Sequence, residues 1–134
     1  VAARPNLRGV RVLVVEDDRD SRDLVETILI GFGAEVQAVD AADTGLELVR
    51  SWRPEVVVSD VEMPEQSGYD FIRRVRALPP REGGLTPAVA LTAYARTEDR
   101  VKTLSAGFQV HLAKPVHPEE LGVAVAALTA RTRP

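Results

Sequence analysis

The three most apolar stretches of the chain are rich in valine, leucine and alanine, and they constrain its fold more than any other feature. These stretches are Val12–Val15, Val56–Val58 and Ala88–Leu91. A strand that is apolar on both sides needs cover on both faces of its sheet, which is typical of parallel sheets packed between helices. We therefore expect a parallel sheet that lies between two layers of helices.

Segments with helical spacing alternate with five strand-like runs. The strands are predicted at Val10–Val15, Glu35–Val39, Val56–Ser59, Ala88–Leu91 and Gln109–Leu112. After each strand, apolar residues recur at steps of three and four, which is the spacing of an amphipathic helix. Thr97 is predicted to cap the fourth helix and Pro118 to begin the fifth, because both residue types favour helix starts. The segment 79–87, which is rich in proline and glycine, is predicted to be a flexible loop.

The distribution of polar residues orders the strands. Glu35–Val39 and Gln109–Leu112 alternate polar with apolar residues, so they are predicted at the edges of the sheet. The order 2-1-3-4-5 follows, a doubly wound (βα)5, flavodoxin-like three-layer α/β sandwich whose ligand crevice lies at the carboxyl ends of strands one and three. We expect a single domain at 10–130, after a linker or N-terminal arm at 1–9 and before a C-terminal tail at 131–134.

The composition excludes several classes of function. The 134 residues include no cysteine, which excludes a thiol nucleophile and a zinc-thiolate site. The net charge of -3 gives no basic footprint for nucleic acid. No long apolar run and no signal peptide is visible, so we expect no membrane contact by this chain and a cytoplasmic location. The chain begins with Val1 and its only methionine is Met63, which indicates a processed protein or a piece of a longer one.

Acidic, hydroxyl and ammonium groups lie where four of the predicted strands end. They are Glu16, Asp17 and Asp18 after the first strand, Asp60 after the third, Thr92 after the fourth and Lys114 after the fifth. Each has an ordinary structural explanation alone, because acids cap helices, a lone aspartate forms turns and a lysine before proline is usually at the surface. The carboxyl ends of parallel strands meet at one rim, however, so the joint arrangement indicates a site.

The chemistry of this set favours a divalent cation and a phosphoryl group. Two like charges at about 4 Å repel by about 4 kcal/mol at an effective dielectric of about 20, so the carboxylates must hold protons or bind a cation. Mg²⁺ suits oxygen ligands and shares phosphate oxygens, with Mn²⁺ as the alternative ion. Zinc is disfavoured, because His111 and His117 form no metal-ligand pattern. An aspartate is a recognised nucleophile for phosphoryl transfer, which a lysine ammonium and a threonine hydroxyl would assist.

These residues resemble the receiver domain of two-component response regulators. The motifs that carry the resemblance are Val14–Asp18, Ser59–Pro64 with Gly68, Leu91–Ala93 and Lys114–Pro115. The resemblance covers about residues 10–130, nearly the whole chain. It implies phosphorelay signalling in which a histidine kinase or a histidine phosphotransfer domain supplies the phosphoryl group.

The resemblance also implies a role for each acidic residue. Asp60 would be the phosphoacceptor and a metal ligand. Asp17 would ligate Mg²⁺ directly, Glu16 mainly through water, and Glu62 through its backbone carbonyl. Such a domain accepts the phosphoryl group and slowly hydrolyses its own aspartyl phosphate, whereas kinase activity would need a kinase domain elsewhere in the parent chain.

Two further residues take roles by the same resemblance. Lys114 would pair with Asp60 and then contact the phosphoryl group, and the bond from Lys114 to Pro115 is expected to be cis. Thr92 would turn toward the phosphoryl oxygens and report phosphorylation by changing the face that partners read.

Two positions need separate interpretation. The family usually has tyrosine or phenylalanine three residues before the lysine, where this chain has His111. We interpret His111 either as a half-exposed edge-strand residue or as a polar switch that titrates near neutrality. Tyr94, two residues after Thr92, is predicted to shield the acyl phosphate from water, so that replacing it with alanine would shorten the lifetime of the phosphate.

Other functional readings remain open. One is a constitutive pseudo-receiver that binds partners without phosphorylation, although such domains typically lose one of the site residues. Another is a flavodoxin-like or phosphatase-like protein, although the acidic run after the first strand would repel phosphate without a metal. The run Ala90–Ala95, together with Ala106–Gln109, resembles the C-terminal receiver of a hybrid sensor histidine kinase. For the oligomeric state we expect a monomer or a weak dimer.

Overall fold

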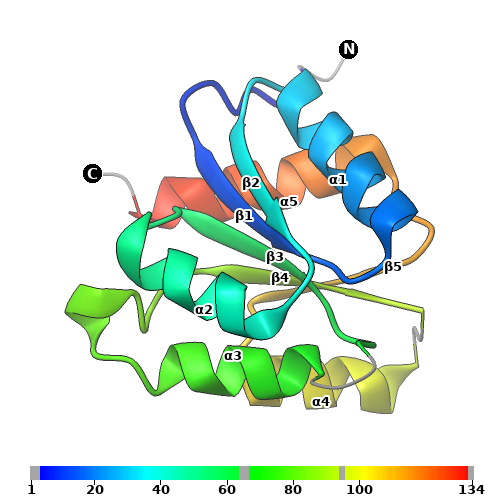
Figure 1. Ribbon diagram of the computed structural model, residues 1–134. Helices are drawn as coiled ribbons and strands as arrows, with labels where there is room; N and C mark the ends of the chain where they lie inside the picture. The colour runs from blue at the N-terminus through cyan, green and yellow to red at the C-terminus, as the bar shows by residue number, and fades with distance from the viewer. Residues whose placement is uncertain (1–3, 64–66, 94–95, 133–134) are drawn as a thin grey trace.

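Strands and helices alternate along the chain in the computed structural model, which describes residues 4–63, 67–93 and 96–132 (Figure 1). The elements are β1 (Arg11–Val15), α1 (Arg19–Gly31), β2 (Glu35–Val39), α2 (Ala42–Ser51), β3 (Val56–Asp60), α3 (Gly68–Arg76), η1 (Pro80–Glu82), β4 (Ala88–Thr92), α4 (Thr97–Ala106), β5 (Val110–Ala113) and α5 (Pro118–Thr132). The strands form one parallel sheet in the order β2-β1-β3-β4-β5, as predicted. Helices α1 and α5 cover one face and α2, α3 and α4 the other, so the predicted three-layer sandwich is confirmed.

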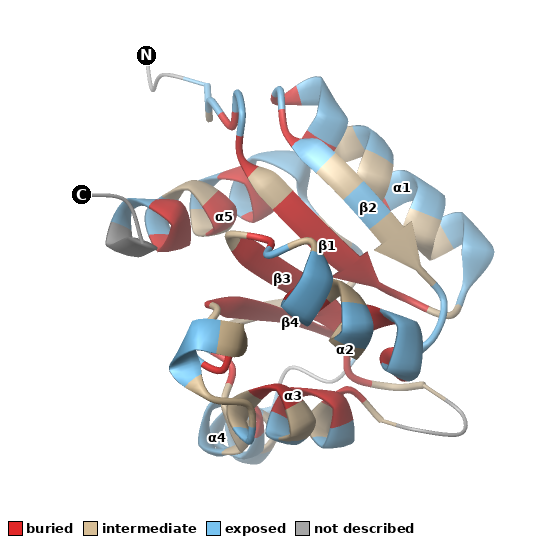
Figure 2. Ribbon diagram, turned by 60° about the vertical axis from the view of Figure 1, so that its left-hand side comes forward, coloured by how far each residue is buried: buried red, intermediate tan, exposed pale blue. Residues whose placement is uncertain are grey.

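Burial separates the central strands from the edge strands. Every residue of β3 and β4 is buried, and so is all of β1 except its first residue. Figure 2 shows these three strands as the buried interior of the molecule. The edge strands β2 and β5 contain only half-buried or exposed residues, which confirms the prediction from their alternating patterns.

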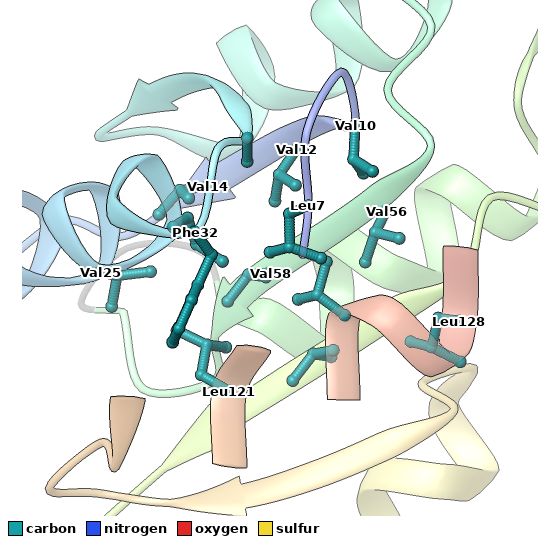
Figure 3. Close-up of a cluster of buried hydrophobic side chains, with 14 of the residues drawn as sticks. Leu7, Val10, Val12, Val14, Val25, Phe32, Val56, Val58, Leu121 and Leu128 are labelled. Carbon is teal, nitrogen blue, oxygen red and sulfur yellow. The ribbon is translucent and has the colours of Figure 1, made fainter. Parts of the chain in front are cut away.

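One apolar core lies between the sheet and the helices α1 and α5. Val25 and Phe32 reach it from α1 and its carboxyl end, Leu121 from α5, and Val12 from the sheet (Figure 3). Leu7 is fully buried in the same core, and its backbone amide donates to the Phe32 carbonyl at 2.8 Å. Leu7 therefore packs with the domain, although it lies in the segment expected to be a linker or arm. The boundaries of the domain stay predictions.

The structure corrects two local expectations. Helix α4 begins at Thr97, but its N-cap is Arg96, whose side chain forms no capping hydrogen bond. The segment 79–87 is not a featureless flexible loop, because it forms the short helix η1 and then turns at Gly83, where φ is 106°. Gly83 and Gly84 are both buried. A left-handed φ suits glycine because it has no Cβ to clash with the backbone.

Arg76, at the end of α3, joins this segment to the rest of the fold. Its guanidinium donates to the carbonyls of Gly84 and Thr86 at 2.9 and 2.7 Å, and to the carbonyl of Gly107 at 2.8 and 3.0 Å. It also donates to the side-chain oxygen of Gln109 at 3.1 Å. Arg76 is therefore half-buried and bonded to the backbone, whereas Arg73 on the same helix is exposed.

Candidate functional site

The topology brings the acidic residues of β1 and β3 together. These strands are neighbours in the sheet, and Val15 lies opposite Ser59, so the next residues, Glu16 and Asp60, lie side by side at its edge. One carboxylate oxygen from each of Glu16, Asp17 and Asp60 lies within 4.8 Å of the others. Glu16 and Asp60 are only 1% and 2% exposed, whereas Asp17 lies nearer to solvent. The sequence therefore placed these three acids together correctly.

Lys114 reaches the same acids from the end of β5. Its ammonium nitrogen lies 2.9 Å from Asp60 Oδ1 and 3.1 Å from Glu16 Oε1. Its backbone amide donates to the Thr92 carbonyl at 2.8 Å, which fixes the chain at the end of β4. The peptide bond to Pro115 is cis, as predicted. One ammonium group therefore forms ion pairs with two buried carboxylates.

The electrostatics of the cluster reflect this imbalance of charge. Burial, and then the charge and hydrogen bonding of Asp60, raise the pKa of Glu16 to about 7 in spite of Lys114. Burial works against the charge of Lys114, but the hydrogen bonds to Asp60 and Glu16 outweigh it and raise the pKa of the lysine. Two buried carboxylates share one ammonium, and a divalent cation would supply further positive charge.

The third acid of the first run is structural. The carboxylate of Asp18 caps α1 by accepting from the Ser21 amide at 2.9 Å, and this bond is the main reason that the pKa of Asp18 is lowered. Arg22 supports the same turn, because it donates to the carbonyls of Glu16 and Asp17 at 3.0 and 3.3 Å. We did not single out Arg22 from the sequence, since its partners lie five and six residues away and share no motif with it.

Gly68 allows α3 to begin close to Asp60. Its amide donates to the Val61 carbonyl at 2.9 Å, and a Cβ at this position would overlap the backbone carbonyl oxygen of Asp60. Only glycine fits such a close approach without moving the chain. The helix itself is capped by Ser67, whose hydroxyl accepts from the Asp70 amide at 3.2 Å.

The side chain of Glu62 binds the end of β4. Its Oε1 atom accepts from the Thr92 hydroxyl at 3.1 Å and from the Ala93 amide at 2.6 Å. Its own amide donates to Asp60 Oδ1 at 3.4 Å. The other carboxylate oxygen, Oε2, is buried and has no hydrogen-bond partner within the described part of the chain. Sequence reasoning assigned the Glu62 carbonyl to the metal, and by resemblance it placed Glu62 at a position that tunes hydrolysis of the acyl phosphate. It did not predict these side-chain contacts.

The predicted roles of His111 and Tyr94 stay predictions. His111 is half-buried on β5 opposite Ala90, and its Nε2 atom is buried without a hydrogen-bond partner among the residues that the structure describes. Both interpretations of His111, edge residue and switch, stay predictions. Tyr94 lies outside the described residues, and so does its predicted shielding role.

The donor set fits Mg²⁺. The three clustered side chains offer only carboxylate oxygens, and Glu16, Asp17, Asp60 and Glu62 line one open hollow together with Lys114. Magnesium prefers such hard oxygen donors and keeps several of its waters, so it needs an open site rather than a closed protein cage. The residues that would hold the ion are those predicted from the sequence, and their individual roles stay predictions.

Comparisons with known proteins agree with this geometry. Residues 12–126 match the family described as the response regulator receiver domain. A protein of Leptolyngbya boryana, described as an uncharacterized 14.6 kDa protein in the sodA1 3'region, is 49% identical over 115 residues, which cover 86% of each chain. The response regulator MprA of Mycolicibacterium vanbaalenii is 38% identical over 125 residues, which cover 93% of this chain. Those residues cover 52% of MprA, so the present chain spans about half of that regulator.

A solved structure of similar fold comes from a sensor kinase. The receiver domain of the sensor histidine kinase PA1611 of Pseudomonas aeruginosa PAO1 superposes with a TM-score of 0.82 at 30% identity, covering 91% of this chain and 98% of that one. It is described as having a magnesium ion coordinated in the active site cleft.

The fold, the acidic site and the family match lead to one conclusion. The chain belongs to the response regulator receiver domains and is a receiver domain of two-component signal transduction. Receiver domains of this family interact with histidine kinases or phosphotransfer proteins, and they bind Mg²⁺ at an acidic pocket with which this cluster is compatible. Within the described residues, no helix is both long and apolar enough to cross a membrane.

Proposed function

We propose that this receiver is an active phosphoacceptor, in which Asp60 takes a phosphoryl group from the phosphohistidine of a histidine kinase or a histidine phosphotransfer domain. One observation carries the proposal. The Asp60 carboxylate is 2% exposed, yet it lines an open hollow beside two other acids and lies 2.9 Å from the Lys114 ammonium. A nucleophile, a counter-charge and a set of cation ligands therefore converge on one point.

The transfer itself needs little covalent chemistry from the protein. An oxygen of the Asp60 carboxylate forms a bond to phosphorus while the bond from phosphorus to the donor's imidazole nitrogen breaks. The electron pair of the broken bond stays with the imidazole. The transition state is loose, so positioning and neutralisation of charge provide most of the acceleration.

The other residues of the cluster supply that positioning. Glu16, Asp17, Asp60 and the carbonyl of Glu62 would hold Mg²⁺, with Mn²⁺ as a substitute, and the ion when bound neutralises charge on the phosphoryl oxygens. The Lys114 ammonium would turn from the free carboxylate to the phosphoryl group. The Thr92 hydroxyl would donate to a phosphoryl oxygen, and this change would reach α4 and β5, where His111 lies.

The cellular setting follows the family. We expect the reaction to take place in the cytoplasm, with the chain as a monomer or weak dimer, without direct binding of nucleic acid or membrane. The resemblance to hybrid kinases favours a place at the end of such a kinase. The alternative, a constitutive pseudo-receiver, is disfavoured by the complete set of Glu16, Asp17, Asp60, Thr92 and Lys114.

Labelling by a small phosphodonor tests the proposal. The protein is incubated with phosphoramidate and Mg²⁺, and its intact mass is measured. We expect one phosphoryl adduct on the wild type, none on Asp60→Asn, and none when a chelator is added before the donor. Asp23→Asn is the matched control, because its side chain on α1 is 61% exposed and it should label like the wild type. Equal labelling of wild type and Asp60→Asn would reject the assignment.

A further inference from the structure

The side chain of Glu62 holds two hydrogen-bond donors at the end of β4, the strand that pairs with the one ending at Asp60. Its Oε1 atom accepts from the Thr92 hydroxyl at 3.1 Å and from the Ala93 amide at 2.6 Å, across 30 and 31 residues of sequence. These bonds join the loop after β3 to the loop after β4. A movement of Glu62 therefore changes the hydrogen bonding of Thr92 and Ala93.

The Glu62 carboxyl group is held in this position at a cost. One of its oxygens, Oε2, is buried without a hydrogen-bond partner among the described residues. The ammonium of Lys114 is bound instead to Glu16 and Asp60. A buried and unsatisfied carboxylate oxygen is destabilising, so the arrangement depends on the two bonds that Oε1 makes.

The position of Glu62 also ties it to the acceptor. Its backbone amide donates to Asp60 Oδ1 at 3.4 Å, so Glu62 contacts the carboxylate that would carry the phosphoryl group. A phosphoryl group at Asp60 would add up to two negative charges in the hollow that Glu62 also lines, and like charges repel. The phosphoryl oxygens would also be better acceptors for the same hydroxyl and amide donors.

We infer that the Glu62 carboxylate is a latch that occupies the Thr92 hydroxyl and the Ala93 amide until a phosphoryl group on Asp60 displaces it. The inference rests on the proposed function, because it needs Asp60 to be the acceptor. Glu62 is in this sense a positioning residue. In the unphosphorylated protein it holds the end of β4, and its release removes one hydrogen bond from the Thr92 hydroxyl and one from the Ala93 amide. Phosphoryl uptake must break two hydrogen bonds, so the latch slows uptake.

Removal of the carboxylate tests the latch. Wild type and Glu62→Ala are incubated with phosphoramidate and Mg²⁺, and the rate of phosphoryl uptake is followed by intact mass. Loss of one or two net hydrogen bonds predicts uptake faster by about three- to tenfold in Glu62→Ala. Glu62→Gln, which keeps an acceptor but loses the charge, should lie between them. Glu98→Ala is the matched control, since it removes an exposed acid from the first turn of α4 and should behave as wild type.

The Ala93 amide gives a second readout, which a change in global stability would not mimic. In nuclear magnetic resonance spectra of unphosphorylated proteins, the Ala93 resonance of Glu62→Ala should move toward its position in phosphorylated wild type. Equal uptake rates together with an unmoved Ala93 resonance would overturn the latch alone. An absence of label on every variant, wild type included, would overturn the proposed function and the latch with it.

Discussion

The two ends of the central sheet both bury charge, but they treat it in opposite ways. At the amino ends of β4 and β5, the Arg76 guanidinium donates to backbone carbonyls and to the Gln109 side chain, all of which are neutral acceptors. At the carboxyl ends of β1 and β3, the buried acids Glu16 and Asp60 share the single ammonium of Lys114. The Arg76 guanidinium has hydrogen-bond acceptors around it, whereas Glu16 and Asp60 are two acids that face one another.

The comparison distinguishes the charge of Arg76, which supports the structure, from the charges of Glu16 and Asp60, which lie at the candidate site. Arg76 joins α3 to the segments before β4 and β5, and its bonds gain stability because each buried carbonyl finds a donor. At the other end, burial and the charge of Asp60 raise the pKa of Glu16, so its charged form costs stability. Clusters of this kind are typical of functional sites, where groups with perturbed pKa values and incompletely neutralised charge bind a ligand.

The largest effect is expected at the structural end. Arg76→Ala leaves the carbonyls of Gly84, Thr86 and Gly107 without their donor, which we expect to lower the free energy of unfolding by about 3 kcal/mol. Arg73→Ala, which removes a 57% exposed arginine from the same helix, should change it by less than about 0.5 kcal/mol. Urea unfolding measures both. Similar free energies of unfolding for the two variants would contradict the structural role of Arg76.

A smaller effect is expected where Lys114 serves the acids. Lys114→Gln leaves Glu16 and Asp60 facing each other without a counter-charge, and Glu16 can relieve part of the repulsion by taking up a proton. We expect a loss of about 2 kcal/mol in the free energy of unfolding without metal. Mg²⁺ should narrow the gap to wild type, because it replaces the missing positive charge. Urea unfolding with and without Mg²⁺ checks this, and a gap that Mg²⁺ leaves unchanged would contradict it.

The last effect, which is the smallest for a change of one pH unit, concerns the pH dependence of stability that Glu16 causes. Its pKa is raised from 4.5 to about 7 in the folded protein, so the folded state binds more protons than the unfolded state between these values. The stabilisation is fully present below pH 4.5 and is lost as the pH rises through about 7. Its slope is at most about 1.4 kcal/mol per pH unit. Unfolding of metal-free protein across this range should show a slope that Glu16→Gln lacks, and parallel curves would contradict the assignment.

The strand order and the acidic cluster were predictable because both leave a trace in the sequence. A strand buried on both faces must be apolar throughout, and parallel strands must end at one rim, so patterns such as Val56–Val58 and the position of Asp60 determine where the site lies. The N-cap of α4 was misplaced by one residue, since Thr97 resembles a cap and Arg96 does not. The roles of the individual site residues and the domain boundaries remain predictions.

Other features leave no such trace. The contact of Glu62 with Thr92, the bonds of Arg76 to Gly107 and the burial of Leu7 all join residues far apart in the chain. Each depends on the rotamer of a long side chain or on the path of a loop, and neither is set by local periodicity. Residues of the same type a few positions away, such as Arg73, are exposed. A sequence pattern alone does not distinguish them.

Chemical trapping of the phosphorylated residue tests the central claim most directly. Borohydride reduces an acyl phosphate to the alcohol, so an aspartyl phosphate becomes homoserine, and peptide mass spectrometry then identifies the position. After incubation with phosphoramidate and Mg²⁺, we predict homoserine at position 60 and at no other aspartate, and no conversion without the metal. Conversion at Asp17 or elsewhere, or none at position 60, would contradict the account.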